Sequence, residues 1–142
     1  MALRSSLQTT AVIPARQEGE LLVGLTHVTV TIRNPGDLTR KWQGVFLVDT
    51  GAIDCMVPAN HLHHIGIRPR GVRDYQLADG TEVNYEIGVA EVEFFETIVG
   101  ATVVFGGDDV EPILGVTALE SAGIVVDPRT QELKRLPALP LK

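Results

Sequence analysis

Alternating apolar and polar residues predict a fold built mainly of β-strands. Residues 28–32, with the sequence VTVTI, alternate strictly, and the segment NPGD at 34–37 separates them from a second predicted strand at 42–49. Strict alternation is typical of a strand with one buried face, and Asn, Pro, Gly and Asp favour tight turns. The pattern therefore predicts a hairpin whose second strand leads into Asp49.

The segment 75–94 predicts a second hairpin, because Asp79-Gly80 is a typical turn pair and the residues on both sides have β character. Apolar residues occupy odd positions up to Val89 and even positions after it. A shift of one residue moves apolar side chains to the other face of a strand. The change of phase predicts either a bulge or a strand that changes partners near Val89.

Two segments follow a similar plan, and each predicts a short helix. In residues 56–67, Pro58 suits the first helical position and Gly66 suits the left-handed position that ends a helix. Residues 113–124 repeat this plan with an apolar pair, a helical segment and a closing glycine. The chain therefore has the pattern of two related halves in an all-β fold with one or two short helices.

Length and composition fit one compact domain. The chain has 142 residues, of which 44% are hydrophobic and 21% are charged. Residues 1–18 show no clear period and predict a flexible or partner-dependent arm, followed by one folded domain at 19–142. The end of the chain predicts a strand, a turn around Asp127-Pro128 and an edge segment.

The charge of the chain limits its partners. A formal net charge of −6 gives no broad basic field, so we expect neither nucleic acid nor an anionic membrane as the main partner. A small basic group, Arg68, Arg70 and Arg73, is expected to be a solvated loop. No signal-peptide core and no apolar run of transmembrane length occur, so we expect a cytoplasmic protein.

Cysteine and histidine suggest no further chemistry. The single cysteine, Cys55, cannot form an internal disulfide, and we expect it to be a small packing residue. His61, His63 and His64 lie close together, but a pair at helical spacing needs a third metal ligand that the sequence does not provide. We therefore expect a surface helix face and no metal site.

An ionisable residue directly follows four apolar ones. Residues 45–48, VFLV, predict a strand with both faces buried, and Asp49 ends it, followed by Thr50 and Gly51. A carboxylate in such a place costs free energy unless it is paired or hydrogen-bonded, so its presence there suggests a function. A turn-capping role for Asp49 is one alternative, but it leaves the two related halves unexplained.

Three motifs carry a resemblance to a known family. DTGA at 49–52, ADG at 78–80 and ILG at 113–115, in this order, resemble the motifs of the retropepsin-like (retroviral-type) aspartic proteases. The resemblance covers residues 28–136 and implies a single-lobe acid protease barrel. It also implies an aspartic endopeptidase that cleaves peptides or proteins and needs no metal or other cofactor.

The resemblance also implies a homodimer. Peptide hydrolysis of this kind needs one carboxylate as base and a second as acid, and two close carboxylates that share one proton supply both. The sequence has no second Asp-Thr-Gly, so the second acid has to be Asp49 of another copy of the chain. Activity then depends on a two-fold dimer with the site on its axis.

The family's functional residues map onto this chain by motif. Asp49, Thr50 and Gly51 would form the catalytic loop, in which Thr50 bonds across the axis and Gly51 allows close approach. The hairpin turn at 79–80 would act as a flap over the substrate. Substrate contacts would come from Ala52, Ile53, Asp54, Asp79 and Gly80. The supporting strand would consist of Ile113, Leu114 and Gly115.

The sequence departs from the family in two respects. Retroviral members commonly have an acid after DTGA that pairs with an arginine after the ILG-like glycine, whereas these places hold Ile53 and Val116. Asp54 is a candidate to replace part of that pair. Ala52 has no hydroxyl to donate to Asp49, so we expect activity in mildly acidic solution. The missing pair keeps a second hypothesis open, namely a catalytically silent binding or assembly module with the same fold.

Overall fold

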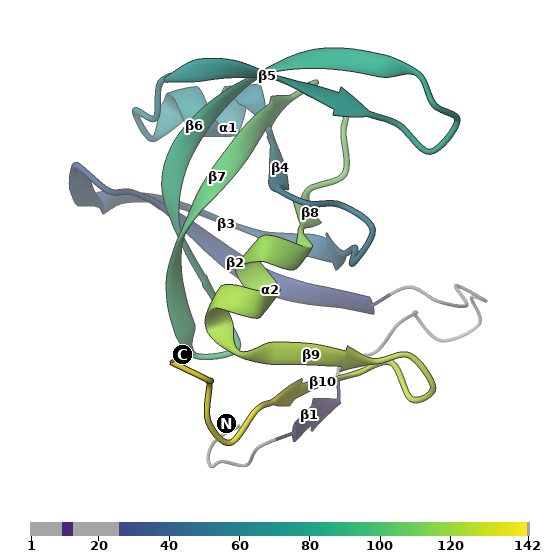
Figure 1. The fold of residues 1–142 in the computed structure, drawn as a ribbon. Helices are drawn as coiled ribbons and strands as arrows, with labels where there is room; N and C mark the ends of the chain where they lie inside the picture. Colours follow the sequence, from purple (N-terminus) through teal and green to yellow (C-terminus); the bar gives the residue numbers. More distant parts are fainter. Residues whose placement is uncertain (1–9, 13–25, 142) are drawn as a thin grey trace.

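The computed structural model describes residues 10–12 and 26–141, and it is mainly β. Two helices and ten strands are present in these residues (Figure 1). The strands are β1 (Thr10–Val12), β2 (Thr26–Asn34), β3 (Asp37–Val48), β4 (Cys55–Pro58), β5 (Gly71–Gln76), β6 (Glu82–Phe94), β7 (Thr97–Gly106), β8 (Ile113–Leu114), β9 (Ile124–Asp127) and β10 (Glu132–Arg135). The helices are α1 (Ala59–His64) and α2 (Val116–Ala122).

Seven strands form one sheet in the order β2-β3-β8-β4-β7-β6-β5. A further pairing between β2 and β6 closes this sheet into a barrel. Most neighbours are antiparallel, but β3 pairs with β8 in parallel, and so does β4 with β7. Strands β1, β10 and β9 form a separate three-stranded sheet, and α2 lies between it and the barrel (Figure 1). The predicted all-β architecture with two short helices is confirmed.

The hairpin predicted ahead of Asp49 is formed by β2 and β3. Its turn is closed by Asn34, whose side-chain Oδ1 accepts the amide of Gly36 at 2.8 Å. The alternation in β2 places its apolar side chains in the core, as expected. In β3, however, Val45 is 59% exposed, so the prediction of a strand buried on both faces was wrong at this position. Only one face of β3 packs against the barrel interior.

Strand β6 explains the change of phase near Val89. Its register with β7 runs without a shift from Ile87 to Phe94, so no bulge occurs there. On its other edge, β6 pairs with β5 through residues 82–87 and with β2 through residues 91–93. The alternative of a strand that changes partners is therefore confirmed. Ala90, Val92 and Phe94 are buried, whereas the odd-numbered apolar residues before Val89 are only partly buried on the opposite face.

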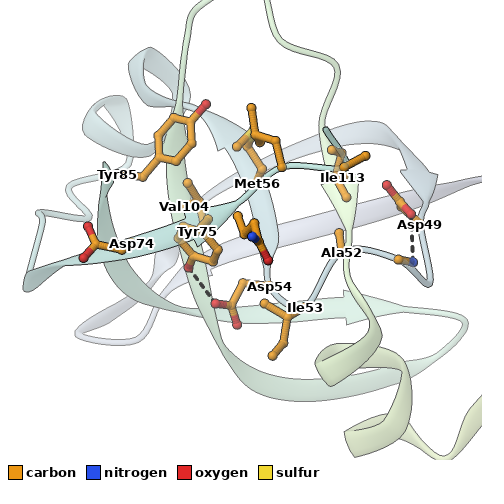
Figure 2. A pocket seen from close by; sticks show the side chains of 14 residues that line it. Asp49, Ala52, Ile53, Asp54, Met56, Asp74, Tyr75, Tyr85, Val104 and Ile113 are labelled. Atoms are coloured by element: carbon orange, nitrogen blue, oxygen red, sulfur yellow. Dashed lines mark hydrogen bonds between the residues drawn. The ribbon is translucent and has the colours of Figure 1, made fainter. Parts of the chain in front are cut away.

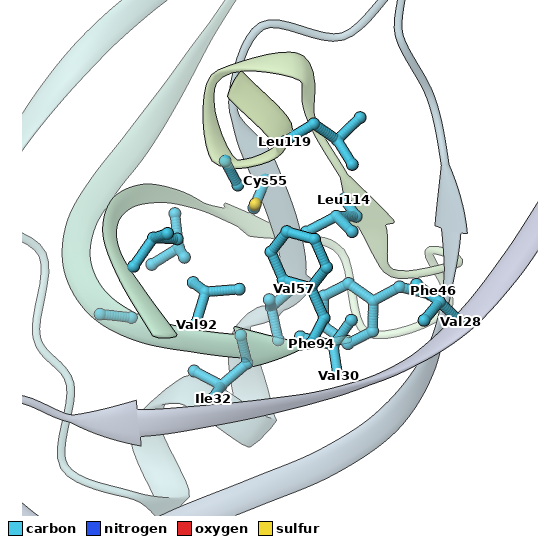
Figure 3. Packing of buried hydrophobic residues seen from close by; sticks show 14 of the residues in the cluster. Val28, Val30, Ile32, Phe46, Cys55, Val57, Val92, Phe94, Leu114 and Leu119 are labelled. Atoms are coloured by element: carbon cyan, nitrogen blue, oxygen red, sulfur yellow. The ribbon is translucent and has the colours of Figure 1, made fainter. Parts of the chain in front are cut away.

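The core fills the barrel and extends to the two helices (Figure 3). Its largest fully buried side chains include Phe46, Phe94 and Leu114. Leu62 anchors α1 in this core, and α2 contributes Leu119. Burial of a side chain of this size contributes about 1.5–3 kcal/mol. Packing therefore stabilises both helices, which are too short to be stable on their own.

Glycines end both helices, as the sequence predicted. Gly66 has a φ of 83° and Gly123 a φ of 71°, which is the left-handed region that only glycine adopts at little cost. Pro58 was expected at the first helical position, but α1 begins at Ala59. Pro58 is the last residue of β4 and immediately precedes α1, because its backbone is still extended, with a ψ of 132°.

The end of the chain differs from the prediction. Strand β10 was expected at an edge, but it pairs with β9 on one side and with β1 on the other. Arg135 of β10 also donates hydrogen bonds to the Phe95 carbonyl and the Thr97 hydroxyl, and its guanidinium lies over the Phe95 ring. Residues 1–9 and 13–18 of the expected arm lie outside the described residues.

The helices are too short to cross a membrane. In the described ranges, neither α1 nor α2 approaches the length and apolar character that a membrane-spanning helix needs.

Cys55 is expected to resist alkylation in the folded protein. Its side chain is buried, and burial raises the pKa of the thiol to about 11, with a smaller contribution from the charge of Asp54. The reactive thiolate is therefore scarce at neutral pH. Iodoacetamide at pH 7.5, followed by mass spectrometry, should modify Cys55 only after denaturant is added. Full modification without denaturant would show that β4 opens readily.

Candidate active site

Asp49 leaves the barrel at the end of β3 and is held there by the other half of the chain. Its amide donates to the carbonyl of Leu114 at 3.0 Å, and two residues earlier the amide of Leu47 donates to the carbonyl of Pro112 at 2.9 Å. These bonds continue the parallel pairing of β3 with β8. The bond to Leu114 holds the backbone of Asp49, and the residue is half-buried and lines a cleft.

The loop after Asp49 folds back onto this residue. One carboxylate oxygen, Oδ1, accepts the amide of Gly51 at 2.9 Å, and the Asp49 carbonyl accepts the amide of Ala52 at 3.1 Å. Figure 2 shows the bond between Asp49 and Gly51 as a dashed line. A carboxylate that bonds two residues ahead forms a compact turn. The turn fixes the direction in which the carboxylate points.

Gly115 packs directly against this loop. A Cβ atom at Gly115 would lie 2.6 Å from the carbonyl carbon and oxygen of Asp54 and 3.0 Å from the carbonyl oxygen of Ala52. The next two amides, of Val116 and Thr117, donate to the carbonyls of Ala52 and Ile53. The segment expected to support the loop therefore holds it through backbone contacts that leave no space for a side chain.

A cleft of about 660 Å³ opens beside Asp49. One wall is formed by the loop at 51–54, and the facing wall comes from the β5–β6 hairpin through residues 74–78 and Tyr85 (Figure 2). Met56, Val104 and Ile113 form an apolar floor. The cleft thus combines an apolar surface with a few polar groups, which is typical of a binding site.

The structure brings together most of the residues proposed from sequence. Ala52, Ile53 and Asp54 line the cleft. Asp79 and Gly80 form the hairpin turn, where Asp79 Oδ1 accepts the Thr81 amide at 2.9 Å, but they do not line the cleft in a single chain. Gln76, Leu77 and Ala78 face it instead. Thr50 is exposed on the surface of the loop.

Sequence reasoning missed a polar bridge between the loop and the hairpin. Asp54 Oδ2 accepts the Tyr75 hydroxyl at 2.6 Å and Arg73 Nη1 at 2.8 Å. Arg73 had been assigned to a solvated basic loop, whereas it lies in β5 and forms an ion pair. Arg68 and Arg70 are exposed, in agreement with that assignment. The two-residue spacing of Arg73 and Tyr75 was the available signal, because it places both side chains on one face of a strand.

The histidines lie apart from the cleft. His61 stacks on Trp42 with ring centroids 4.2 Å apart, and His63 lies near the ring of Phe105. Within the described part of the chain, no three His, Cys, Asp or Glu side chains are grouped as metal ligands. His63 and His64 are exposed, as expected for a surface face of α1, and Leu62 is the buried residue of this helix.

Comparison of structures finds similar folds, whereas comparison of sequences finds no match. No protein-family model matches the chain, and neither does any curated protein. A retropepsin-like aspartic protease from Rickettsia conorii matches with a TM-score of 0.59 at 19% identity, covering 89% of this chain and 90% of that one. This chain has a retropepsin-like fold. The single-lobe barrel predicted from the motifs is thereby confirmed.

A second solved structure is also similar. The protease of simian foamy virus (mac) matches at 17% identity with a TM-score of 0.48, covering 67% of this chain and 92% of that one. In this chain, the loop that carries Asp49 follows strand β3 of the barrel and lines the cleft.

Proposed function

We propose that the protein is a homodimeric aspartic endopeptidase. Asp49 and the partner's Asp49 would share one proton and activate a water molecule for attack on a peptide bond. One observation carries the proposal: within a retropepsin-like fold, the backbone of Asp49 is held by β8 and its carboxylate by the amide of Gly51, at the mouth of a cleft.

The dimer is part of the proposal because one chain supplies only one such loop. Like carboxylates held close together cannot both ionise freely, so the pair retains one proton. Thr50 is exposed beside Asp49, and Ile53 is 58% exposed, which leaves both available to a second copy. Thr50 would donate to the partner's loop and thereby fix the separation of the two acids.

The chemistry then follows from the two protonation states. The ionised carboxylate takes a proton from water, whose oxygen attacks the carbonyl carbon, while the protonated carboxyl group donates to the carbonyl oxygen. Transfer of a proton to the amide nitrogen allows the C–N bond to break. Neither step requires a metal or another cofactor.

Substrate would lie extended between the loop and the hairpin. Gly51 allows its backbone to approach the acids, and Ala52, Ile53 and Asp54 would contact its side chains. The β5–β6 hairpin, with Asp79 and Gly80 at its turn, would act as a flap that excludes water. The apolar floor of the cleft favours apolar side chains next to the cleaved bond.

A binding module with the same fold is the second candidate. Ile53 and Val116 occupy places where retroviral relatives commonly have a charge pair, so that contribution to substrate and dimer binding is absent. Such a module would hold an extended peptide in the cleft without cleaving it.

Cleavage of an unfolded, apolar-rich protein separates the two candidates. Casein should be cut by the wild type between about pH 4 and 7, and the Asp49→Asn variant at matched dimer content should be at least about 100-fold slower, because the shared-proton pair is lost. Peptide products are measured by mass spectrometry. Equal rates for both proteins would exclude Asp49 as the catalytic acid. Two folded, dimeric and inert proteins that still bind casein peptides would favour the binding module.

A further inference from the structure

The bridge between Asp54 and β5 joins the two walls of the cleft. Asp54 lies at the end of the loop that begins at Asp49, and its side chain is 6% exposed. Tyr75 and Arg73, both on β5, donate to the same carboxylate oxygen. Figure 2 shows the bond from Tyr75 and how its ring reaches across to Asp54. The contact therefore links the loop to the strand that leads into the hairpin turn.

The two donors differ in strength. The Arg73 side chain is 47% exposed, and an exposed ion pair contributes little because water competes with it. Tyr75 is half-buried, and its bond to a carboxylate is charge-assisted and short. Burial, and then the hydrogen bond to Asp54, raise the pKa of Tyr75 to about 12. The phenol therefore keeps its proton and remains a donor throughout the neutral and acidic range.

Strand β5 has few other attachments. Its strand partner is β6, and no second strand pairs with it among the described residues. Five of its six residues are exposed, and Tyr75 is the one that is half-buried. An edge strand with so little burial opens easily unless something fixes it. The Asp54 carboxylate is the polar group that fixes it to the opposite wall.

We propose that Asp54 is a positioning residue that sets the height of the β5–β6 hairpin above the cleft through Tyr75 and Arg73. The inference rests on the proposed function, since a flap matters only to a protein that encloses a peptide. The hairpin would then be partly ordered before substrate arrives. A flap that is already partly ordered loses less conformational freedom when it closes over a substrate.

The bridge differs from the charge pair that this chain lacks. That pair would join the position of Ile53, in the loop, to that of Val116, the first residue of α2. Here the neighbouring carboxylate, Asp54, instead bonds to the hairpin. Buried charge at this place is therefore used to position the flap.

Hydrogen exchange of the substrate-free protein tests the inference without any cleavage. Tyr75→Phe removes one hydroxyl and keeps the ring. Tyr85→Phe is the matched control, because Tyr85 packs edge-on against Tyr75 and its hydroxyl has no hydrogen-bond partner in the described residues. We expect the hairpin amides, including that of Leu77, which donates to Thr81, to exchange about five- to tenfold faster in Tyr75→Phe only.

The order of effects gives a second readout. Asp54→Asn should accelerate exchange at least as much as Tyr75→Phe, and Arg73→Gln should have a smaller effect because that donor is exposed. In cleavage assays, Tyr75→Phe should raise KM about fivefold and leave kcat within about twofold, as expected for lost binding shared by ground and transition states. A fall in kcat alone would assign Tyr75 to the chemistry instead.

The test separates this inference from the proposed function. If the wild type cleaves nothing but Tyr75→Phe still accelerates hairpin exchange, the positioning role stands and the protease proposal fails. If Tyr75→Phe and Asp54→Asn exchange like Tyr85→Phe while all remain folded, the bridge does not hold the hairpin and the inference is overturned, whatever the activity.

Discussion

Addition of excess Asp49→Asn chain is expected to suppress the activity of the wild-type protein. Each proposed site takes one acid from each of two copies, so a mixed dimer contains a single carboxylate and cannot carry out both proton transfers. With nine parts of variant to one of wild type and random exchange, about one tenth of wild-type chains retain a wild-type partner. Casein cleavage per wild-type chain should therefore fall about tenfold.

A second variant controls for dilution. Asp109 is an exposed carboxylate beyond β7 and takes no part in the loop or the cleft. Dimers between wild type and Asp109→Asn keep both copies of Asp49, so their activity per chain should match that of the wild type. Energy transfer between labelled chains verifies that subunits exchange. Unchanged activity in the Asp49→Asn mixture, with exchange demonstrated, would mean that one chain holds a complete site.

Gly115→Ala is expected to remove activity and to destabilise the fold. The new Cβ would lie 2.6 Å from the Asp54 carbonyl, a backbone group that cannot rotate away as a side chain could. The loop or α2 has to move, and the bonds from Val116 and Thr117 to the loop are then weakened. Overpacking of this kind costs about 1–3 kcal/mol, to which the weakened bonds add. Denaturant melts and casein cleavage measure both effects.

Gly100→Ala is the matched control for this substitution. Gly100 lies in β7, and a Cβ atom there would meet nothing within 4 Å. Its unfolding free energy should change by less than about 0.5 kcal/mol, as is usual at an exposed site. If Gly115→Ala were as stable and as active as Gly100→Ala, the loop would not be packed on the glycine as described.

Local patterns in the sequence predicted the parts of the fold that depend on one element and its neighbour along the chain. The β2–β3 hairpin follows from alternation and a turn of Asn, Pro and Gly. The partner change in β6 follows from its shift of apolar phase. These features can be predicted from sequence because the burial of each side chain depends on which face of its own strand it occupies.

Local sequence patterns did not predict which distant strands pair with each other. Nothing in Ile113-Leu114 shows that β8 inserts between β3 and β4, or that it runs parallel to β3. The β6–β7 turn also lacks the usual signal, since Phe95 and Glu96 adopt positive φ without glycine or asparagine. Arg135, from the end of the chain, bonds to the Phe95 carbonyl and helps to hold that turn. Tertiary contacts here override local preference.

In the candidate site too, the features within one segment were predicted and a contact between distant segments was not. The motif around Asp49 pointed to the loop, and the glycine of the second half pointed to its support. The bridge from Asp54 to Tyr75 depends on how far the hairpin leans over the loop, which no local pattern encodes. Charge composition even suggested the opposite for Arg73, because a cluster of arginines is usually solvated.

The support of Asp49 by β8 has a consequence for the time at which the site forms during synthesis. The groups that hold the loop, from the Pro112 carbonyl to the Thr117 amide, are translated about 60 residues after the acid itself. A nascent chain therefore carries Asp49 on the ribosome before the backbone groups that hold its loop in place have been made. The loop gains its full support only after residues 112–117 have emerged from the ribosome, so its packing is a late event in the folding of the nascent chain.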